Sequence, residues 1–277
     1  MGNSINISKY LGSKVRGIEP PVVSGPSLDP DAAAFLTAAG ITDATISSAI
    51  NTLVLDLKSY GIWTKMKAMY PFVGGTATTH KFNLINPADT NAAYRLVFLG
   101  GVTHSAFGIQ GNAINGYANT WFNVGTELSS GVGGLGFYSR TNIQGGREMG
   151  INVTNGSRSL IVIPRYIDDV FYANEGSASW LTSPNLDGRG FYTVTRTGLG
   201  ASNGASYKNG VRVQTSSFSF LSFDSANAYI LVANGFAQYS GKQCAFAYIE
   251  NQGLSDADNF NLYNIVQTFQ TTLGSQV

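Results

Sequence analysis

The chain has 277 residues, of which only 12% are charged, and its formal net charge at pH 7 is +1. Such a charge creates no long-range field that attracts nucleic acid or an anionic membrane, so neither is expected as a partner. The single cysteine, Cys244, excludes an internal disulfide and a zinc site made of several cysteines. No run reaches the roughly 18 apolar residues that a membrane helix needs, so membrane insertion is not expected.

Residues 1–27 are predicted to form an extended arm. The later part contains Pro20, Pro21 and Pro26. Proline has no backbone donor and favours extended conformations in the residue before it.

Residues 28–62 are predicted to form two short helices. Asp29 can cap the first, Pro30 suits its first position and Gly40 ends it. Thr42 or Asp43 can cap the second. The second helix carries an apolar stripe at helical spacing, made of Ile46, Ile50, Leu53, Val54 and Leu57. We expect this stripe to pack on the chain's own sandwich, with a neighbouring subunit as the alternative.

From Trp63 onward, short alternating runs are separated by Gly, Asn, Asp and Pro, which is typical of a β-sandwich. The candidate strands are residues 66–71, 80–83, 95–99, 104–110, 117–122, 135–139, 148–153, 160–166, 169–173, 190–196, 206–208, 211–214, 229–233 and 243–249. Asn209 and Gly210 indicate a two-residue hairpin turn, because both positions of a type I′ turn need positive φ.

The chain ends in a predicted helix that is capped near residues 254–258 and closes at Gly274. Its apolar side is formed by Phe260, Leu262, Tyr263, Val266, Phe269 and Leu273. The sequence therefore predicts a mainly β protein, with a sandwich and a C-terminal helix over residues 63–277.

Three stretches together resemble a recurrent module of bacteriophage structural proteins, especially those of phages that infect Bacteroidota. They are residues 28–41, 50–65 and 70–75. The turn at residues 206–211 resembles the hairpin of concanavalin A-like (laminin-G-like) jelly rolls. Residues 244–255, with the helix that ends at 269–274, resemble the final strand and tail helix of the same phage domains. The resemblance spans about residues 28–277.

The resemblance implies a virion component with a concanavalin A-like jelly-roll domain, in a spike, a head fibre or a tail fibre. Its expected partners are other virion proteins and a host-surface glycan, and we expect a homo-oligomer, with a trimer as the working hypothesis. The arm lies outside the resemblance, which suits docking onto one particular particle. The candidate docking residues are Ile5, Tyr10, Val22 and Val23.

Catalysis is not expected, and neither is a cofactor. Laminarinases share the concanavalin A-like fold, but their Glu-x-Asp-x-x-Glu pattern is missing, and the five glutamates are scattered singly. The one acidic doublet, Asp168 and Asp169, is expected in a turn or at a strand edge. It could contribute to a calcium site but falls far short of six oxygen ligands, so a metal stays unknown.

Two glycine-rich stretches have the residue pattern of enzyme motifs but lack the flanking secondary structure that those motifs need. Residues 200–204 match the nucleophile elbow around Ser202, yet no apolar strand precedes them and no helix follows. Residues 131–136 match the dinucleotide fingerprint, but a strand follows where that motif needs a helix. We interpret the first as a loop and the second as a flexible loop or a glycine bulge.

Sugar recognition would use aromatic faces together with polar side chains on loops, because a pyranose has apolar C–H patches and a rim of hydroxyls. The stretch 180–190 is the best such loop, and the candidate glycan-binding residues are Trp180, Asn185, Asp187, Arg189 and Tyr192. The expected function is a virion structural protein that displays a lectin-like sandwich. The alternatives are a free carbohydrate-binding or glycan-hydrolysing protein of this class, and a purely architectural capsid decoration or vertex subunit.

Overall fold

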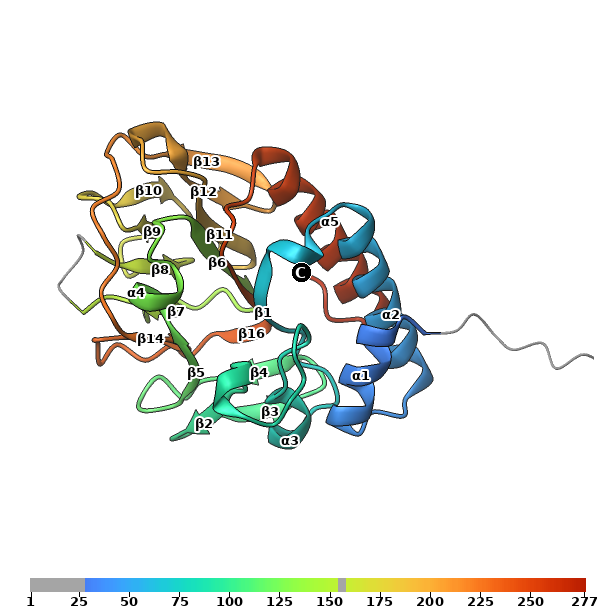
Figure 1. Ribbon diagram of the computed structural model, residues 1–277. Helices are drawn as coiled ribbons and strands as arrows, with labels where there is room; N and C mark the ends of the chain where they lie inside the picture. Colours follow the sequence, from blue (N-terminus) through green and yellow to red (C-terminus); the bar gives the residue numbers. More distant parts are fainter. Residues whose placement is uncertain (1–27, 154–157) are drawn as a thin grey trace, which may run out of the picture.

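The computed structural model describes residues 28–153 and 158–277 and has three layers: helices, a first sheet and a second sheet (Figure 1). The N-terminal arm, with Ile5, Tyr10, Val22 and Val23, lies outside the described residues. Among the described residues, no helix combines the length and the apolar character that are needed to cross a bilayer.

Sheet A is the central layer. Its strands, in spatial order, are β13 (Val211–Thr215), β12 (Gly204–Lys208), β11 (Gly190–Arg196), β6 (Gly133–Ser139), β16 (Gln243–Glu250), β4 (Gly108–Gln110) and β3 (Thr103–Ser105), and β1 (Met66–Tyr70) also pairs with β16. The pairs in this sheet are antiparallel.

Sheet B forms the other half of the sandwich. Its strands, in spatial order, are β10 (Leu181–Pro184), β9 (Val170–Glu175), β8 (Leu160–Ile163), β7 (Met149–Ile151), β14 (Asn227–Ile230), β5 (Tyr117–Asn123) and β2 (Val97–Leu99). These pairs are antiparallel, whereas β15 (Val232–Asn234) pairs with β7 in parallel.

The inner core lies between the two sheets. Alternate residues of a strand point to opposite faces, so the inward-facing side chains of the two sheets meet in this core. Its buried members include Leu135, Phe137, Val194, Leu160, Val162 and Phe171. This burial is the main attraction that holds sheet A against sheet B.

The outer core lies between sheet A and the helices α1 (Pro30–Ala39), α2 (Ala44–Ser59) and α5 (Asp256–Thr272). The three helices cover one face of sheet A (Figure 1). Buried side chains of the helices, Phe35, Leu53 and Phe269, belong to one cluster with aromatic side chains of that face, Tyr138, Phe191 and Phe246. The apolar stripe of α2 therefore packs on the chain's own sandwich, as expected.

The helix ends follow the sequence signals. The Asp29 side chain accepts a hydrogen bond from the Asp31 amide, and Gly40 ends α1 with φ of 65°. Asp43 caps α2, and Ser255 caps α5 in a capping box with Asp258.

Several predicted elements need correction. Residues 80–83 are not a strand, because Thr76 caps the short helix α3 (Ala77–His80), which ends where the strand was expected. Residues 104–110 are a hairpin of β3 and β4, and 229–233 are divided between β14 and β15 at Leu231, whose φ is 71°. Strand β10 lies in the stretch that was expected to be a loop.

The remaining short elements are α4 (Val124–Glu127) and three turns of 3₁₀ helix at Trp63–Lys65, Asn91–Ala93 and Ala201–Asn203.

The Asn209 and Gly210 hairpin is confirmed, with φ of 52° and 74°. Asp168 and Asp169 lie in the bend between β8 and β9, which confirms the turn. Ser202 lies in the 3₁₀ turn between β11 and β12, so the nucleophile-elbow geometry is absent there.

Candidate functional site

The structure separates the predicted glycan-binding residues into three groups. Trp180 is half-buried and directly precedes β10, whereas Asp187 and Arg189 lie on an exposed loop beyond its other end. Asn185 and Tyr192 are buried. The prediction that these two side chains contact a ligand is therefore wrong.

The buried pair holds the loop in place instead. Tyr192 points from β11 into the inner core, and its hydroxyl donates to the Asp187 carbonyl at 2.8 Å. The Asn185 amide donates to the Tyr192 hydroxyl and accepts from Lys208 Nζ at 2.6 Å. Sequence could not reveal this role, because a loop asparagine and a strand tyrosine also suit a sugar site.

The two exposed loop residues pair with each other. Arg189 Nη2 lies 2.8 Å from Asp187 Oδ2, and this hydrogen bond lowers the pKa of Asp187 to about 2. The pair is solvated and internally neutralised, so it offers only weak additional binding energy.

An aromatic site lies on the outer face of sheet B and includes one predicted residue, Trp180. It is a shallow pocket of about 200 Å³ that is lined by Arg147, Ile163, Tyr166, Tyr172 and Trp180. Strand alternation places these side chains outside: Leu160, Val162 and Phe171 enter the inner core, whereas Ile161, Ile163 and Tyr172 form a separate outer cluster.

The rings of the aromatic site are held at right angles to one another. The centroids of Tyr172 and Trp180 are 5.9 Å apart at 89°, and those of Tyr166 and Tyr172 are 5.9 Å apart at 84°. Edge-to-face packing is the favoured arrangement of aromatic rings. The site therefore presents fixed apolar surfaces.

Arg147 supplies the positive charge of the aromatic site. Its guanidinium carbon lies 3.9 Å from the Phe236 ring centroid, 5.7 Å from that of Tyr166 and 6.0 Å from that of Trp180. Nε donates to Gln238 Oε1. Nη1 is buried and has no acceptor among the described residues.

Two further polar groups border the aromatic site. Gln238 Nε2 donates to the Tyr166 hydroxyl at 3.1 Å, and the Tyr172 hydroxyl donates to Asp168 at 2.7 Å. The bond to Asp168 raises the pKa of Tyr172. The arrangement can therefore stack an apolar ligand face and hydrogen-bond polar groups around its edge.

Sequence reasoning missed Arg147, Tyr166 and Tyr172. Strand β8 is apolar at each of its positions, Leu160–Ile163, so alternation cannot tell which face of the sheet is outside. The only usable signal was the density of aromatic residues near Trp180.

Three of the glutamates are fully buried: Glu148, Glu175 and Glu250. Glu148 pairs with Lys242 at 2.8 Å, and Glu175 pairs with Arg196 at 3.0 Å. Burial raises the pKa of Glu148 and raises that of Glu250 to about 7. None of the three carboxyl groups is open to solvent.

No group of three or more His, Cys, Asp or Glu side chains that could hold a metal occurs within residues 28–153 and 158–277. Asp169 pairs with Arg165, while Asp168 bonds Tyr172, so the two carboxylates serve different partners.

The histidines contact each other, with 3.0 Å between Nδ1 of His80 and Nδ1 of His104. Burial lowers the pKa of His80 to about 3.

No protein-family model matches the sequence, and no curated protein matches it. Solved structures with a similar fold include Trypanosoma rangeli sialidase in complex with sialic acid, at 11% identity and a TM-score of 0.53, over 71% of this chain and 32% of that one. The fold is a lectin-like β-sandwich. The expected mainly β, concanavalin A-like jelly-roll class is thereby confirmed.

A second similar structure is botulinum neurotoxin type C, which depends on interaction with two ganglioside molecules to enter cells. It is 16% identical with a TM-score of 0.50, over 75% of this chain and 53% of that one. The chain therefore spans about a third of the length of the sialidase and about half that of the neurotoxin chain. At such identities the likeness concerns the fold alone.

Proposed function

We propose that this chain is a glycan-binding structural protein of a bacteriophage particle, which docks through its N-terminal arm and displays the aromatic site. The observation that carries glycan binding is the grouping of Tyr166, Tyr172 and Trp180 around the guanidinium of Arg147.

This grouping suits a sugar for two physical reasons. The aromatic faces can cover the apolar C–H side of a pyranose, which excludes water from both surfaces. The Tyr172 hydroxyl and the Gln238 side-chain amide border the rings, and groups of this kind can hydrogen-bond the hydroxyls around a sugar. The similar sialidase structure contains sialic acid, and the similar neurotoxin interacts with gangliosides. Both ligands are consistent with a glycan as the ligand of this chain.

The layer order supports display from a particle. Residue 28 adjoins α1 in the helical layer, and sheet B lies on the opposite side of sheet A (Figure 1). The aromatic site lies on the outer face of sheet B. A chain anchored before residue 28 would therefore turn the aromatic site away from its anchor. The assignment to a phage particle rests on the sequence resemblance to structural proteins of Bacteroidota phages. A homo-oligomer, with a trimer as the working hypothesis, stays a prediction.

The proposal is binding rather than hydrolysis. A retaining glycosidase needs two carboxyl groups about 5 Å apart on either side of the scissile bond. Glu148, Glu175 and Glu250 are buried and engaged within the protein, which disfavours such a pair. Incubation with polysaccharides is expected to release no reducing ends.

Glycan binding is tested with the purified chain on a glycan array, followed by titration of the best ligand. We expect Trp180→Ala to weaken binding at least tenfold, because it removes a stacking face. Trp121→Ala is the matched control, since Trp121 is a 38% exposed tryptophan of the same sheet outside the aromatic site. Unchanged binding by Trp180→Ala would overturn the assignment of the site.

The particle assignment is tested by mass spectrometry of purified virions, in which the chain is expected as a stoichiometric component. Its absence would reject the virion role and favour a free lectin. Presence in the particle together with silence across the glycan array would favour the architectural alternative.

A further inference from the structure

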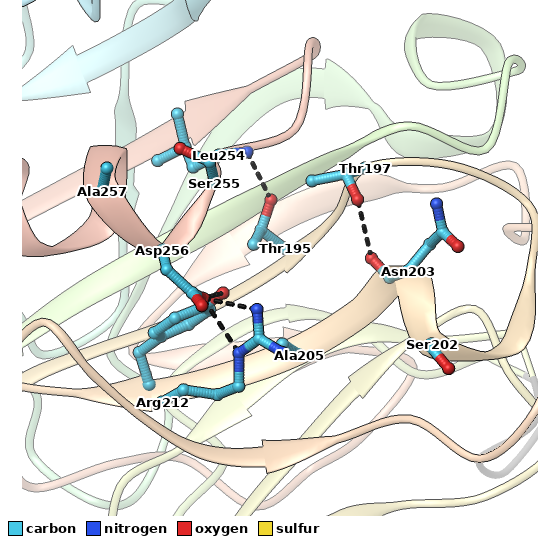
Figure 2. Close-up of a pocket in the computed structure, with 11 residues that line it drawn as sticks. Thr195, Thr197, Ser202, Asn203, Ala205, Arg212, Leu254, Ser255, Asp256 and Ala257 are labelled. Carbon is cyan, nitrogen blue, oxygen red and sulfur yellow. Dashed lines mark hydrogen bonds and ion pairs between the residues drawn. The ribbon is translucent and has the colours of Figure 1, made fainter.

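A second site, distinct from the aromatic one, lies where the β11–β13 side of sheet A meets the start of α5. We call it the polar cleft; its volume is about 490 Å³, and its lining includes Thr195, Thr197, Ser202, Asn203, Arg212 and Asp256 (Figure 2). The volume falls in the range of roughly 300 to 1,000 Å³ that is usual for small-molecule sites. We propose that the polar cleft binds a neutral, hydroxyl-rich ligand, a short oligosaccharide.

One wall of the polar cleft is the loop after β11, and a buried arginine fixes it. Arg196 is fully buried, and its Nη1 donates to the carbonyls of Gly198 and Gly200, both at 2.9 Å. Its Nη2 bonds Glu175 at 3.0 Å and the Phe218 carbonyl at 2.9 Å. The loop that carries Ser202 and Asn203 therefore has a defined shape before any ligand arrives.

The floor of the polar cleft is fixed in a similar way. The Thr195 hydroxyl donates to Glu250 Oε1 at 2.7 Å and accepts from the Leu254 amide at 2.9 Å, a bond drawn in Figure 2. Glu250 also accepts from the Gln252 and Gly253 amides. These bonds join the end of β16 and the start of α5 to β11.

The opposite wall of the polar cleft has balanced charges. Asp256 Oδ1 accepts from Arg212 Nε at 2.9 Å and from the Tyr207 hydroxyl at 2.7 Å (Figure 2). Arg212 is paired with Asp256, so among the described residues that line the polar cleft no unpaired positive charge is left for a phosphate or a carboxylate. The balance favours a neutral ligand.

The rim of the polar cleft has hydrogen-bonding groups to offer. Within the part of the chain that the structure describes, the Ser202 hydroxyl and the Asn203 side-chain amide form no intramolecular hydrogen bond, although both line the cleft. Together they can donate and accept, as sugar hydroxyls do. The exposed Ala257 adds apolar surface for the C–H groups of a sugar.

The polar cleft can be tested independently of the aromatic site. Thr195 and Arg212 belong to the outer face of sheet A, whereas Trp180 lies on the outer face of sheet B. Loss of one site should therefore leave the other unchanged, and the inference does not rest on the proposed function.

The test is titration of the full-length Trp180→Ala variant with three neutral trisaccharides, maltotriose, cellotriose and chitotriose. We expect at least one to bind, and to bind at least tenfold more weakly when Ser202→Ala and Asn203→Ala are added. Asn264→Ala, on the exposed side of α5, is the matched control and should leave binding unchanged.

Three outcomes would overturn the proposal. The first is that none of the three trisaccharides binds the Trp180→Ala variant. The second is that the added Ser202→Ala and Asn203→Ala substitutions leave binding unchanged. The third is that the Trp180→Ala variant binds sialyllactose more tightly than the neutral sugars. If the assignment of the aromatic site is wrong, the wild type and Trp180→Ala will instead bind the glycan array equally.

Discussion

Glu250 combines full burial with the lack of an ion-pair partner among the described residues. Its carboxyl is held by hydrogen bonds from Thr195, Gln252 and Gly253. Burial disfavours the charged form, and it raises the pKa to about 7 from an ordinary value of 4.5. The folded protein therefore binds a proton at Glu250 in a pH range where the unfolded chain has released it.

This proton makes stability depend on pH in a defined direction. Because the folded pKa of Glu250 is the higher one, its contribution is complete below pH 4.5 and is lost as the pH rises through about 7. We expect the free energy of unfolding of the wild type to fall over this interval relative to Glu250→Gln, by at most about 3 kcal/mol.

Urea unfolding of both proteins at pH 5, 6, 7 and 8 measures the difference, because other titrating groups are common to the two chains. Glutamine stays neutral and is similar in shape to the protonated carboxyl. Parallel profiles for wild type and variant would show that Glu250 keeps an ordinary pKa.

At the level of elements, Arg196 ties β11 to β9 through Glu175 and to two loops through backbone carbonyls. Both charges are fully buried, so removal of one leaves the other without compensation. We expect Arg196→Met to lower the free energy of unfolding by about 3 to 5 kcal/mol.

The exposed pair of Asp187 and Arg189 provides the contrast. Arg189→Met removes a comparable ion pair whose side chains are 43% and 53% exposed, and it should cost less than about 1 kcal/mol. Adding Glu175→Gln to Arg196→Met should recover part of the loss, since it removes the uncompensated charge. Equal effects of Arg196→Met and Arg189→Met on urea midpoints would contradict this account.

Elements with local signals could be predicted from the sequence. Asp29 and Pro30 begin a helix, Gly40 ends it, and Asn209 with Gly210 turns a hairpin, because each signal acts within a few residues. The aromatic site could not be predicted beyond Trp180. Its residues come from four separate segments, and only the pairing of β7 to β10 brings them together.

Buried polar residues were misassigned for a related reason. Tyr192 and Asn185 suit a sugar site by type, but their burial depends on which face of β11 meets sheet B. Strand β10 was missed because Pro184 and its polar neighbours look like a loop, although proline is tolerated at the end of an edge strand.

For the whole molecule, the helical segment 28–62 and the sandwich 63–277 share the outer core. Phe35 and Leu53 from the helices and Phe246 from β16 belong to the same buried cluster. A chain that begins at residue 63 would expose this face of sheet A to water.

We therefore expect a chain that begins at residue 28 to fold and a chain that begins at residue 63 to aggregate or unfold, because it loses the apolar contacts of α1 and α2. Circular dichroism and size-exclusion chromatography measure the difference. The chain from residue 28 should also fail to join phage particles; normal incorporation would reject the docking role of residues 1–27. A folded, monodisperse chain from residue 63 would show that the helices are dispensable.

The placement of α1 and the aromatic site in opposite outer layers matters most for many copies at once. If copies are anchored side by side through their N-terminal ends as proposed, all of them would turn the aromatic site the same way, so neighbouring sites could engage one cell surface simultaneously. Multivalent attachment of this kind can exceed the affinity of one site by roughly 10² to 10⁴. If the aromatic site binds a glycan as proposed, even weak binding by each copy would then give firm and still reversible adhesion.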